Sequence, residues 1–234
     1  MRLYQAIFAT WSPAETRRVG GWTLRRGEDS IGLRVTSATR DDPEADIAEA
    51  DAAMRAWGQT PVFMIRPGDE ALDRALAERG YARKAPTLIL AAPAERVASE
   101  DPDERTILGP EPIAAMREIW ADGGVGPPHL AIMARTRGPK TYLLGRCGDS
   151  PAGSAFVACD REVAMLQALQ VLPAFRRQGL GSALARAAAA WALRQDASVY
   201  CLAVEVANAP ARAAYAGIGM EEVSAYHFRI GAAG

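Results

Sequence analysis

The sequence has few of the features that mark secreted or membrane proteins. Its three cysteines, Cys147, Cys159 and Cys201, are scattered and lack CxxC spacing, which excludes a disulfide framework and suits a reducing compartment. No segment approaches the roughly 18 consecutive apolar residues that a membrane-spanning helix needs, and the N-terminus lacks the apolar core of a signal peptide. We therefore expect a soluble, cytoplasmic protein without membrane contacts, in which the cysteines are core or surface residues.

The chain also lacks an excess of charge of one sign. Lysine and arginine number 27 against 28 aspartates and glutamates, a formal net charge of -1. A protein held on a phosphate backbone usually carries a basic surface, so we expect no nucleic-acid partner. Histidine is scarce as well: His129 and His227 lie among apolar neighbours and outside any Cys/His cluster. We predict no metal site and assign neither histidine a catalytic role.

The length of 234 residues allows one large domain or two small ones. The segment LAAPAERVASEDPDERTIL, residues 90–108, combines Pro93 and Pro102 with charged residues between two apolar stretches, as a linker does. We place the domain boundary near residue 98, which divides the chain into residues 1–97 and 98–234.

The second half predicts an α+β domain with a mixed sheet. Residues 110–124 and 127–138 look like two short helices, each opened by proline and closed by glycine. Strands are expected at 140–147, 153–160 and 162–171, and then a long helix from about residue 180. A buried strand at 198–206, a short helix at 208–219 and one or two strands at 221–230 complete the pattern.

One segment within this half carries a ligand-binding signal. VLPAFRRQGLGSALARAAAAWA, residues 171–192, passes from a strand through a glycine turn into a helix, whose free N–H groups attract anions. No lysine follows the glycines as a Walker loop requires, and Leu184 stands where a dinucleotide fingerprint has its third glycine. The remaining pattern is Arg176-x-x-Gly179-x-Gly181.

This turn resembles the acyl-CoA-binding motif of the GNAT superfamily, the acyl-CoA-dependent N-acyltransferases. Asn208, Tyr215 and Gly219 follow it in the order that the family shows, and the preceding meander and paired helices agree as well. The resemblance covers about residues 104–231. It implies the GNAT fold, a mixed central sheet with splayed parallel strands flanked by helices, with acetyl-CoA as the acyl donor and no metal.

The first half repeats part of this pattern. From Asp69 onward it aligns without gaps with the segment after Asn208, so Leu76 stands where Tyr215 stands. Residues 1–95 contain no Arg-x-x-Gly-x-Gly turn, and a tight hairpin explains Gly20-Gly21. We therefore expect two GNAT-like halves, a degenerate one at 1–97 packed against a catalytic one at 98–234. This tandem layout resembles some bacterial GNAT proteins.

The resemblance assigns the donor site to the glycine turn and the strand before it. Backbone N–H groups near Gln178 to Ser182 would bind the pyrophosphate, while Arg176 and Arg177 either contact phosphate or are merely solvated. Backbone groups at Leu169 and Val171 would bind the pantetheine arm and the thioester carbonyl. Asn208 would either bind pantetheine or cap its helix. The expected cofactor-binding residues are Leu169, Gln170, Val171, Arg176, Arg177, Gln178, Gly179, Leu180, Gly181, Ser182 and Asn208.

The resemblance also assigns the catalytic groups. Tyr215 would protonate the leaving CoA thiolate, since a phenol is protonated at neutral pH; the alternative is a buried aromatic. Some members carry a glutamate where Met165 stands here. Glu205 would then remove the proton from the amine, unless it is only a solvated carboxylate at a strand end. Gln167 or Gln170 could order a water.

Two functions follow from these expectations. The first is an N-acetyltransferase acting on a small-molecule or peptide amine. The second is a non-catalytic acyl-CoA-binding sensor or scaffold, which would have little reason to keep Tyr215. A homodimer is an open alternative to a monomer.

Overall fold

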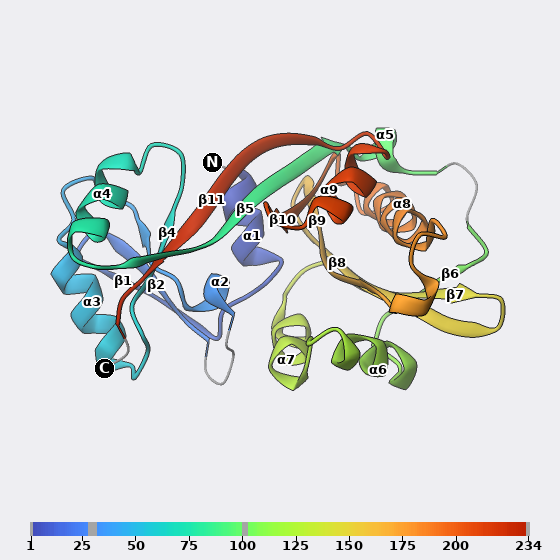
Figure 1. Ribbon diagram of the computed structural model, residues 1–234, viewed down its shortest axis with the longest axis horizontal. Coiled ribbons are helices and arrows are strands. Elements are labelled where there is room, and N and C mark those ends of the chain that lie inside the picture. The colour runs from blue at the N-terminus through green and yellow to red at the C-terminus, as the bar shows by residue number, and fades with distance from the viewer. Residues whose placement is uncertain (1, 28–31, 100–102, 233–234) are drawn as a thin grey trace.

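The computed structural model describes residues 2–27, 32–99 and 103–232. Two lobes lie side by side, and two long strands cross from one lobe to the other (Figure 1). Within the described residues, an eight-stranded sheet has the order β4-β11-β5-β10-β9-β8-β7-β6, and a three-stranded sheet has the order β1-β2-β3. The chain therefore forms the mixed α+β structure that the sequence predicts.

The elements of the first half confirm the hairpin and the strand-helix-strand unit. The antiparallel pair of β1 (Glu15–Val19) and β2 (Trp22–Arg26) turns at Gly20 and Gly21, both with positive φ. The remaining elements are α1 (Arg2–Ala9), α2 (Leu33–Thr36), β3 (Thr39–Arg40), α3 (Ile47–Ala56), β4 (Val62–Ile65), α4 (Glu70–Glu78), β5 (Ala82–Pro93) and α5 (Ala94–Val97).

The second half follows the predicted order. It contains β6 (Thr106–Gly109), α6 (Ala114–Asp122), α7 (Pro127–Arg135), β7 (Lys140–Cys147), β8 (Ser150–Asp160), β9 (Val163–Val171), η1 (Pro173–Phe175), α8 (Leu180–Leu193), β10 (Val199–Glu205), α9 (Ala209–Ala216) and β11 (Glu221–Ile230). The terminal segment 221–230 is one strand with two irregularities in its register.

The expected linker is ordered over its first part, which corrects that prediction. Pro93 ends β5 and opens α5, and Ala94 and Val97 are fully buried in the core under α8. Alanine and valine at these positions remove apolar surface from water, which a solvated linker would not do. Residues 100–102 of the same segment lie outside the described part of the chain.

The two halves exchange strands. β5 belongs to the first half by sequence, yet it lies between β10 and β11 and pairs antiparallel with both. In return, β11 lies between β4 and β5. The pairing of β5 with β11 is reciprocal, because Glu221 is opposite Ala91 and Ile230 is opposite Ala82. The unit β4-α4-β5 thus matches β10-α9-β11, with Gly80 and Gly219 both at positive φ after the helix.

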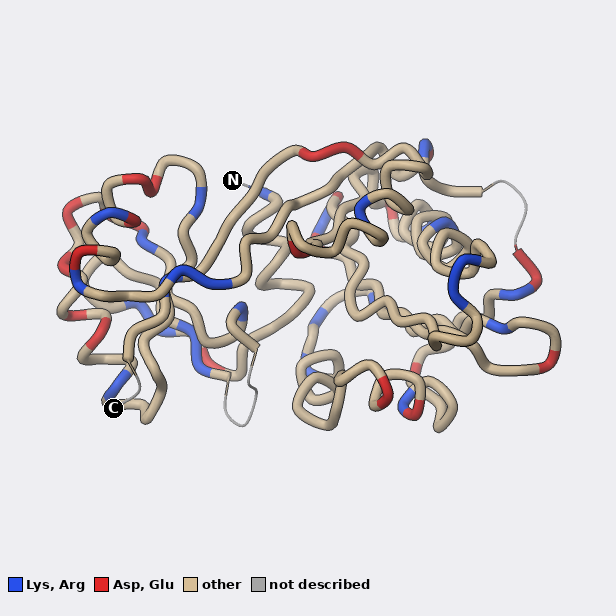
Figure 2. The backbone as a smooth tube through the Cα atoms, viewed as in Figure 1, with Lys and Arg blue, Asp and Glu red and all other residues tan. Residues whose placement is uncertain are grey.

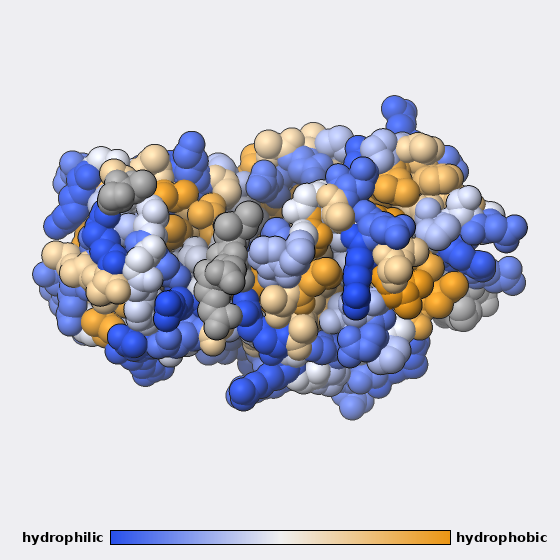
Figure 3. Space-filling view, turned by 90° about the horizontal axis from the view of Figure 1, so that it is seen from below, coloured by the Kyte–Doolittle hydropathy of each residue, from blue (hydrophilic) through white to orange (hydrophobic). Residues whose placement is uncertain are grey.

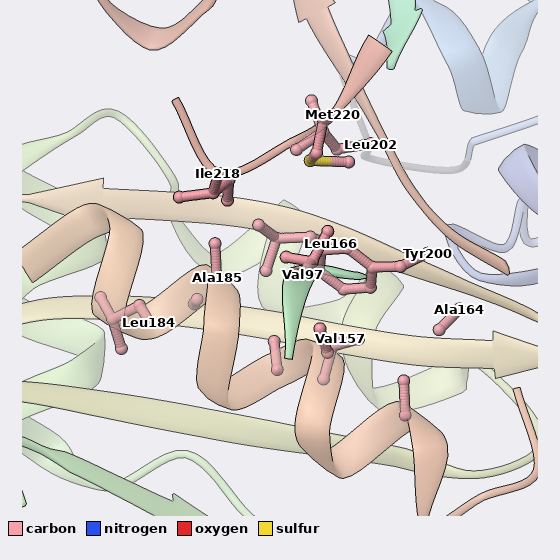
Figure 4. Close-up of a cluster of buried hydrophobic side chains, with 14 of the residues drawn as sticks. Val97, Val157, Ala164, Leu166, Leu184, Ala185, Tyr200, Leu202, Ile218 and Met220 are labelled. Carbon is pink, nitrogen blue, oxygen red and sulfur yellow. The ribbon is translucent and has the colours of Figure 1, made fainter. Parts of the chain in front are cut away.

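Helices cover both faces of the second lobe's sheet. α5 and α8 pack on one face over a core of small and branched residues, where Tyr200 lies among Val97, Leu166 and Leu202 (Figure 4). α6 and α7 pack on the other face with Trp120, Tyr142 and Phe156. The visible surface mixes hydrophilic and apolar residues (Figure 3). No helix within the described residues is long and apolar enough to cross a membrane.

Candidate functional site

The parallel strands β9 and β10 separate midway along their length. Their register runs from Val163 opposite Val199 to Leu166 opposite Leu202, and β9 then continues to Val171. A bulge explains the bend: Ala168 has φ +48, and the β8–β9 register shifts between Gln167 and Gln170. Beyond Leu166, the backbone of β9 is therefore not paired with β10. The two parallel strands splay apart, as the family resemblance implied.

The turn between β9 and α8 presents backbone N–H groups at its open end. Gly179 is the N-cap of α8 and adopts a left-handed conformation, φ +77, that glycine tolerates best. The Ala183 N–H already donates to the Gly179 carbonyl at 3.0 Å. The N–H groups of the three residues between them lie in the first turn, where a helix offers no internal acceptor. Together with the helix dipole they form an anion site.

Two arginines are bound into the turn. Arg176 donates from Nε to the Val171 carbonyl at 3.0 Å, and Arg105 donates to the Gln178 carbonyl at 3.1 Å. Gly181 leaves room beside them: a Cβ added there would lie 3.7 Å from Leu169 and 3.8 Å from Val171, in ordinary contact. A side chain at Gly181 would thus occupy open space without displacing the fold.

A cavity of about 680 Å³ lies in front of this turn, and we call it the donor cavity. Most of the expected cofactor-binding residues line it. Gln178 is the exception. Sequence reasoning missed Phe175 and the face of α9, although the helical spacing from Asn208 could have indicated the latter. The lining residues are Leu169, Gln170, Val171, Phe175, Arg176, Arg177, Gly179, Leu180, Gly181, Ser182, Asn208, Pro210, Ala211 and Ala214.

Asn208 and Tyr215 are placed by α9. The Asn208 side chain caps this helix by accepting a hydrogen bond from the Ala211 N–H at 3.2 Å, and it also lines the donor cavity. Tyr215 lies one turn beyond Ala211, is half-buried and packs against the core under α8. It is not among the residues that line the cavity. Burial raises the pKa of Tyr215 to about 12, so its hydroxyl remains protonated.

Glu205 lies on a different cavity. Leu202 and Val204 of β10 face the core under α8, so Ala203 and Glu205 face the opposite side of the sheet. There a cavity of about 300 Å³ lies between the lobes, and we call it the amine cavity. Its lining residues are Trp11, Gly32, Leu33, Arg34, Ala85, Thr87, His129, Ala203, Glu205, Tyr226 and Phe228.

The amine cavity brings together residues that sequence reasoning did not connect. Arg34 lies 5.3 Å from the ring centre of Trp11, whose ring centre is 6.2 Å from that of His129. Burial and then the charge of Arg34 lower the pKa of His129, which favours a neutral imidazole. The Nδ1 atom of His129 is buried without a hydrogen-bond partner. We expected no role for this histidine, yet it lines the same cavity as Glu205.

The other polar candidates have structural partners. Gln167 accepts from Arg34 at 2.9 Å and donates to the Thr10 hydroxyl at 3.1 Å, so its amide is bound at both ends and the water-ordering hypothesis is not favoured there. His227 bonds to Asp73 at 2.7 Å. Met165 is fully buried. Among the described residues, no group of three or more His, Cys, Asp or Glu is placed to hold a metal ion.

Comparisons with known proteins agree with this geometry. The chain is similar over its whole length to a GCN5-related N-acetyltransferase from Kribbella flavida, of which the match covers 95%. The identity is 18% and the TM-score is 0.70. The chain covers 88% of a tandem GNAT protein from the clavulanic acid biosynthesis pathway, again with its whole length, at 18% identity and a TM-score of 0.60. A functionally unknown conserved protein from Staphylococcus epidermidis is 10% identical with a TM-score of 0.68, and 94% of each chain is covered.

These likenesses show the fold, including its tandem form. None of the curated proteins matches the chain. The family model described as Acetyltransferase (GNAT) family matches residues 103–220, the part that holds the splayed strands, the glycine turn and α9. The chain belongs to the GNAT acetyltransferase family, which implies transfer of an acyl group from acyl-CoA.

Proposed function

We propose that the protein is an N-acetyltransferase that moves the acetyl group of acetyl-CoA to a primary amine by direct attack. The observation that carries the proposal is the donor cavity, which joins the N-terminus of α8 to the free edge of β9. The pyrophosphate binds the first-turn N–H groups of α8, and Arg176 and Arg177 lie beside it. The pantetheine arm then follows β9 from Val171 toward Leu169.

The splay leads the thioester toward the amine cavity. A backbone N–H near Leu169 or Val171 donates to the thioester oxygen as it becomes negative, and one such donor contributes roughly 10² to 10³ in rate. The amine nitrogen attacks the thioester carbon from the side of Glu205. Glu205 takes the proton from nitrogen, directly or through a water. As the carbon–sulfur bond breaks, the thiolate takes the proton of Tyr215.

Two features support Tyr215 as the acid. Ala211 and Ala214 on the same helix line the donor cavity, and no described residue forms a hydrogen bond with the Tyr215 hydroxyl, so its proton is free for the sulfur. The pKa of about 12 means that this hydroxyl carries its proton at neutral pH before the thiolate leaves. The rival function, an acyl-CoA sensor, shares the donor cavity but requires no proton donor at the sulfur.

Acetyl-CoA binding to the intact chain tests the proposal. We expect calorimetric titration to give one site per chain, because the first half has no glycine turn of this kind. At about 100 times Kd the ligand should add roughly 2.7 kcal/mol of stability, seen as a rise in melting temperature. Gly181→Val should abolish the rise and leave the unliganded melting temperature nearly unchanged, because its methyl groups fill the donor cavity.

Gly109→Val is the matched control. Gly109 ends β6, and a Cβ there would lie in ordinary contact, 3.6 Å from the Glu111 carbonyl, away from the donor cavity. Absence of a shift in the parent protein at millimolar acetyl-CoA would contradict the proposal, and two sites per chain would mean that the first half also binds the donor. Binding without thiol release on any amine of a broad panel would favour the sensor.

A further inference from the structure

The amine cavity contains a positive charge that no acid of the described residues neutralises. Arg34, on α2, is half-buried and lines this cavity. It donates to the neutral amide of Gln167 at 2.9 Å, and its guanidinium lies 5.3 Å from the ring centre of Trp11. A partly buried charge without a counterion is unfavourable, so this guanidinium favours an anionic ligand.

The same cavity also contains a negative charge. Glu205 ends β10, and its carboxylate forms no hydrogen bond or ion pair with another described residue. Figure 2 shows the basic position on α2 and the acidic position at the end of β10. Burial is the main cause that raises the pKa of Tyr226; the charge of Arg34 lowers this pKa and that of Glu205 raises it. Both charges therefore lie near one phenol, yet no ion pair joins them.

The imidazole of His129 provides a second donor in this cavity. Its ring centre lies 6.2 Å from that of Trp11, and its Nδ1 atom is buried without a partner. Unpaired buried N–H groups are rarer in proteins than unpaired acceptors, so the proton is assigned to Nε2. Nε2 is not among the buried atoms that lack a partner, and no described residue bonds to it. Its N–H is therefore available to a ligand.

These groups lie where the two parallel strands separate. Gln167, which accepts from Arg34, directly precedes the bulge at Ala168 where β9 leaves β10. Glu205 lies beyond Leu202, the last residue of β10 that pairs with β9. The cavity of about 300 Å³ is at the lower end of the range for small-molecule sites, roughly 300 to 1,000 Å³. The site therefore suits a compact acceptor with both of its charges close together.

We propose that the acceptor is an α-amino acid with an apolar side chain. Its amine lies at Glu205, and its carboxylate accepts from the guanidinium of Arg34 and from the Nε2–H of His129. Its side chain contacts the apolar part of the wall, which includes Leu33 and Phe228. A molecule of this class neutralises both charges of the cavity at once. This inference rests on the proposed function and names the class of acceptor for the same site.

Steady-state kinetics on the full chain, with acetyl-CoA as the donor, tests the inference. The acceptors are alanine, valine, leucine and phenylalanine, each paired with the amine that lacks its carboxylate: ethylamine, isobutylamine, isoamylamine and phenethylamine. We expect kcat/KM to favour the preferred amino acid over its partner by about tenfold, the effect of one charge-assisted hydrogen bond. γ-Aminobutyrate should be a poorer acceptor than this amino acid, because three carbons separate its two charges.

Variants identify the groups that bind the carboxylate. Arg34→Gln should lower the ratio of kcat/KM between amino acid and amine to near one, whereas Arg34→Lys, which keeps the charge, should retain part of it. His129→Phe should lower the ratio by a smaller factor. Arg17→Gln is the matched control, because Arg17 also stacks on an indole, 4.9 Å from the ring centre of Trp57, but lies outside the amine cavity. It should leave the ratio unchanged.

The outcomes separate this inference from the proposed function. Equal kcat/KM within every pair, or an unchanged ratio in Arg34→Gln, overturns the amino-acid acceptor while the transferase remains. A preference for γ-aminobutyrate also overturns it, since the two charges would then bind farther apart. An unchanged ratio in His129→Phe overturns the second donor. Failure of the parent to bind acetyl-CoA overturns the proposed function, and the inference with it.

Discussion

At the scale of single residues, Tyr215 distinguishes a catalyst from a binding protein. Tyr215→Phe removes a proton donor and almost no volume, so acetyl-CoA affinity should stay the same while kcat falls about 10²-fold, near the lower limit for general acid catalysis. Because the pKa of Tyr215 is about 12, its ionisation should add no basic limb to the pH–rate profile below that region. Calorimetric titration and steady-state kinetics on both proteins measure these effects.

Tyr142→Phe is the control for this substitution. Tyr142 is buried on β7 against Trp120 and Phe156, outside both the donor cavity and the amine cavity. Its loss should leave kcat unchanged. If Tyr215→Phe turns over at the parent rate, Tyr215 only packs against the core and the acid is another group.

At the scale of elements, the carboxylate of Asp73 links α4 to β11. Asp73 binds Arg229 and His227, and the hydrogen bond from Arg229 is the largest cause that lowers its pKa from 3.8 to about 2. The pKa of Asp73 is therefore lower in the folded protein than in the unfolded chain. Its ionised carboxylate stabilises the fold at pH values above the unfolded pKa, and this stabilisation is lost as the pH falls toward 2. The shift corresponds to about 2 kcal/mol at neutral pH.

Asp73→Asn should therefore lower the free energy of unfolding by about 2 kcal/mol at pH 7, and the difference from the parent should vanish as the pH approaches 2. Urea denaturation across this range measures it. Asp149→Asn, in the exposed turn between β7 and β8, should change little at any pH. A difference that persists at pH 2 would show that Asp73 acts through packing rather than through its charge.

At the scale of the whole molecule, the strand exchange makes the halves interdependent. β10 pairs with β5 along its full length, from Val199 opposite Pro93 to Glu205 opposite Thr87. A fragment of residues 103–234 loses β4 and β5, which leaves β11 without a strand partner and exposes one edge of β10, so we expect it to be insoluble or unfolded. Co-expression with residues 1–99 should restore a soluble complex, visible by size-exclusion chromatography. A monodisperse, active fragment would contradict this.

The sequence predicts the helices and strands of this molecule well, but it does not predict which of them pack side by side. The glycine turn, α8 and the Asn208 cap are local, so residue spacing and turn chemistry indicate them. The position of β5 between β10 and β11 depends on pairings across more than a hundred residues, which alternation within one strand does not encode. The amine cavity was missed for the same reason: Trp11, Arg34 and His129 meet only through the packing of distant segments.

The exchange of β5 and β11 also determines when the protein can fold during its synthesis. β11 comprises residues 221–230, so it leaves the ribosome after the other described helices and strands. Until then the first lobe lacks a strand between β4 and β5, and β5 has a free edge beside β10. The eight-stranded sheet is therefore incomplete until β11 has emerged. A chain that stops before β11 therefore leaves β4 without its neighbour in the sheet and β5 with one unpaired edge, so the first lobe is the part of the molecule that must fold last.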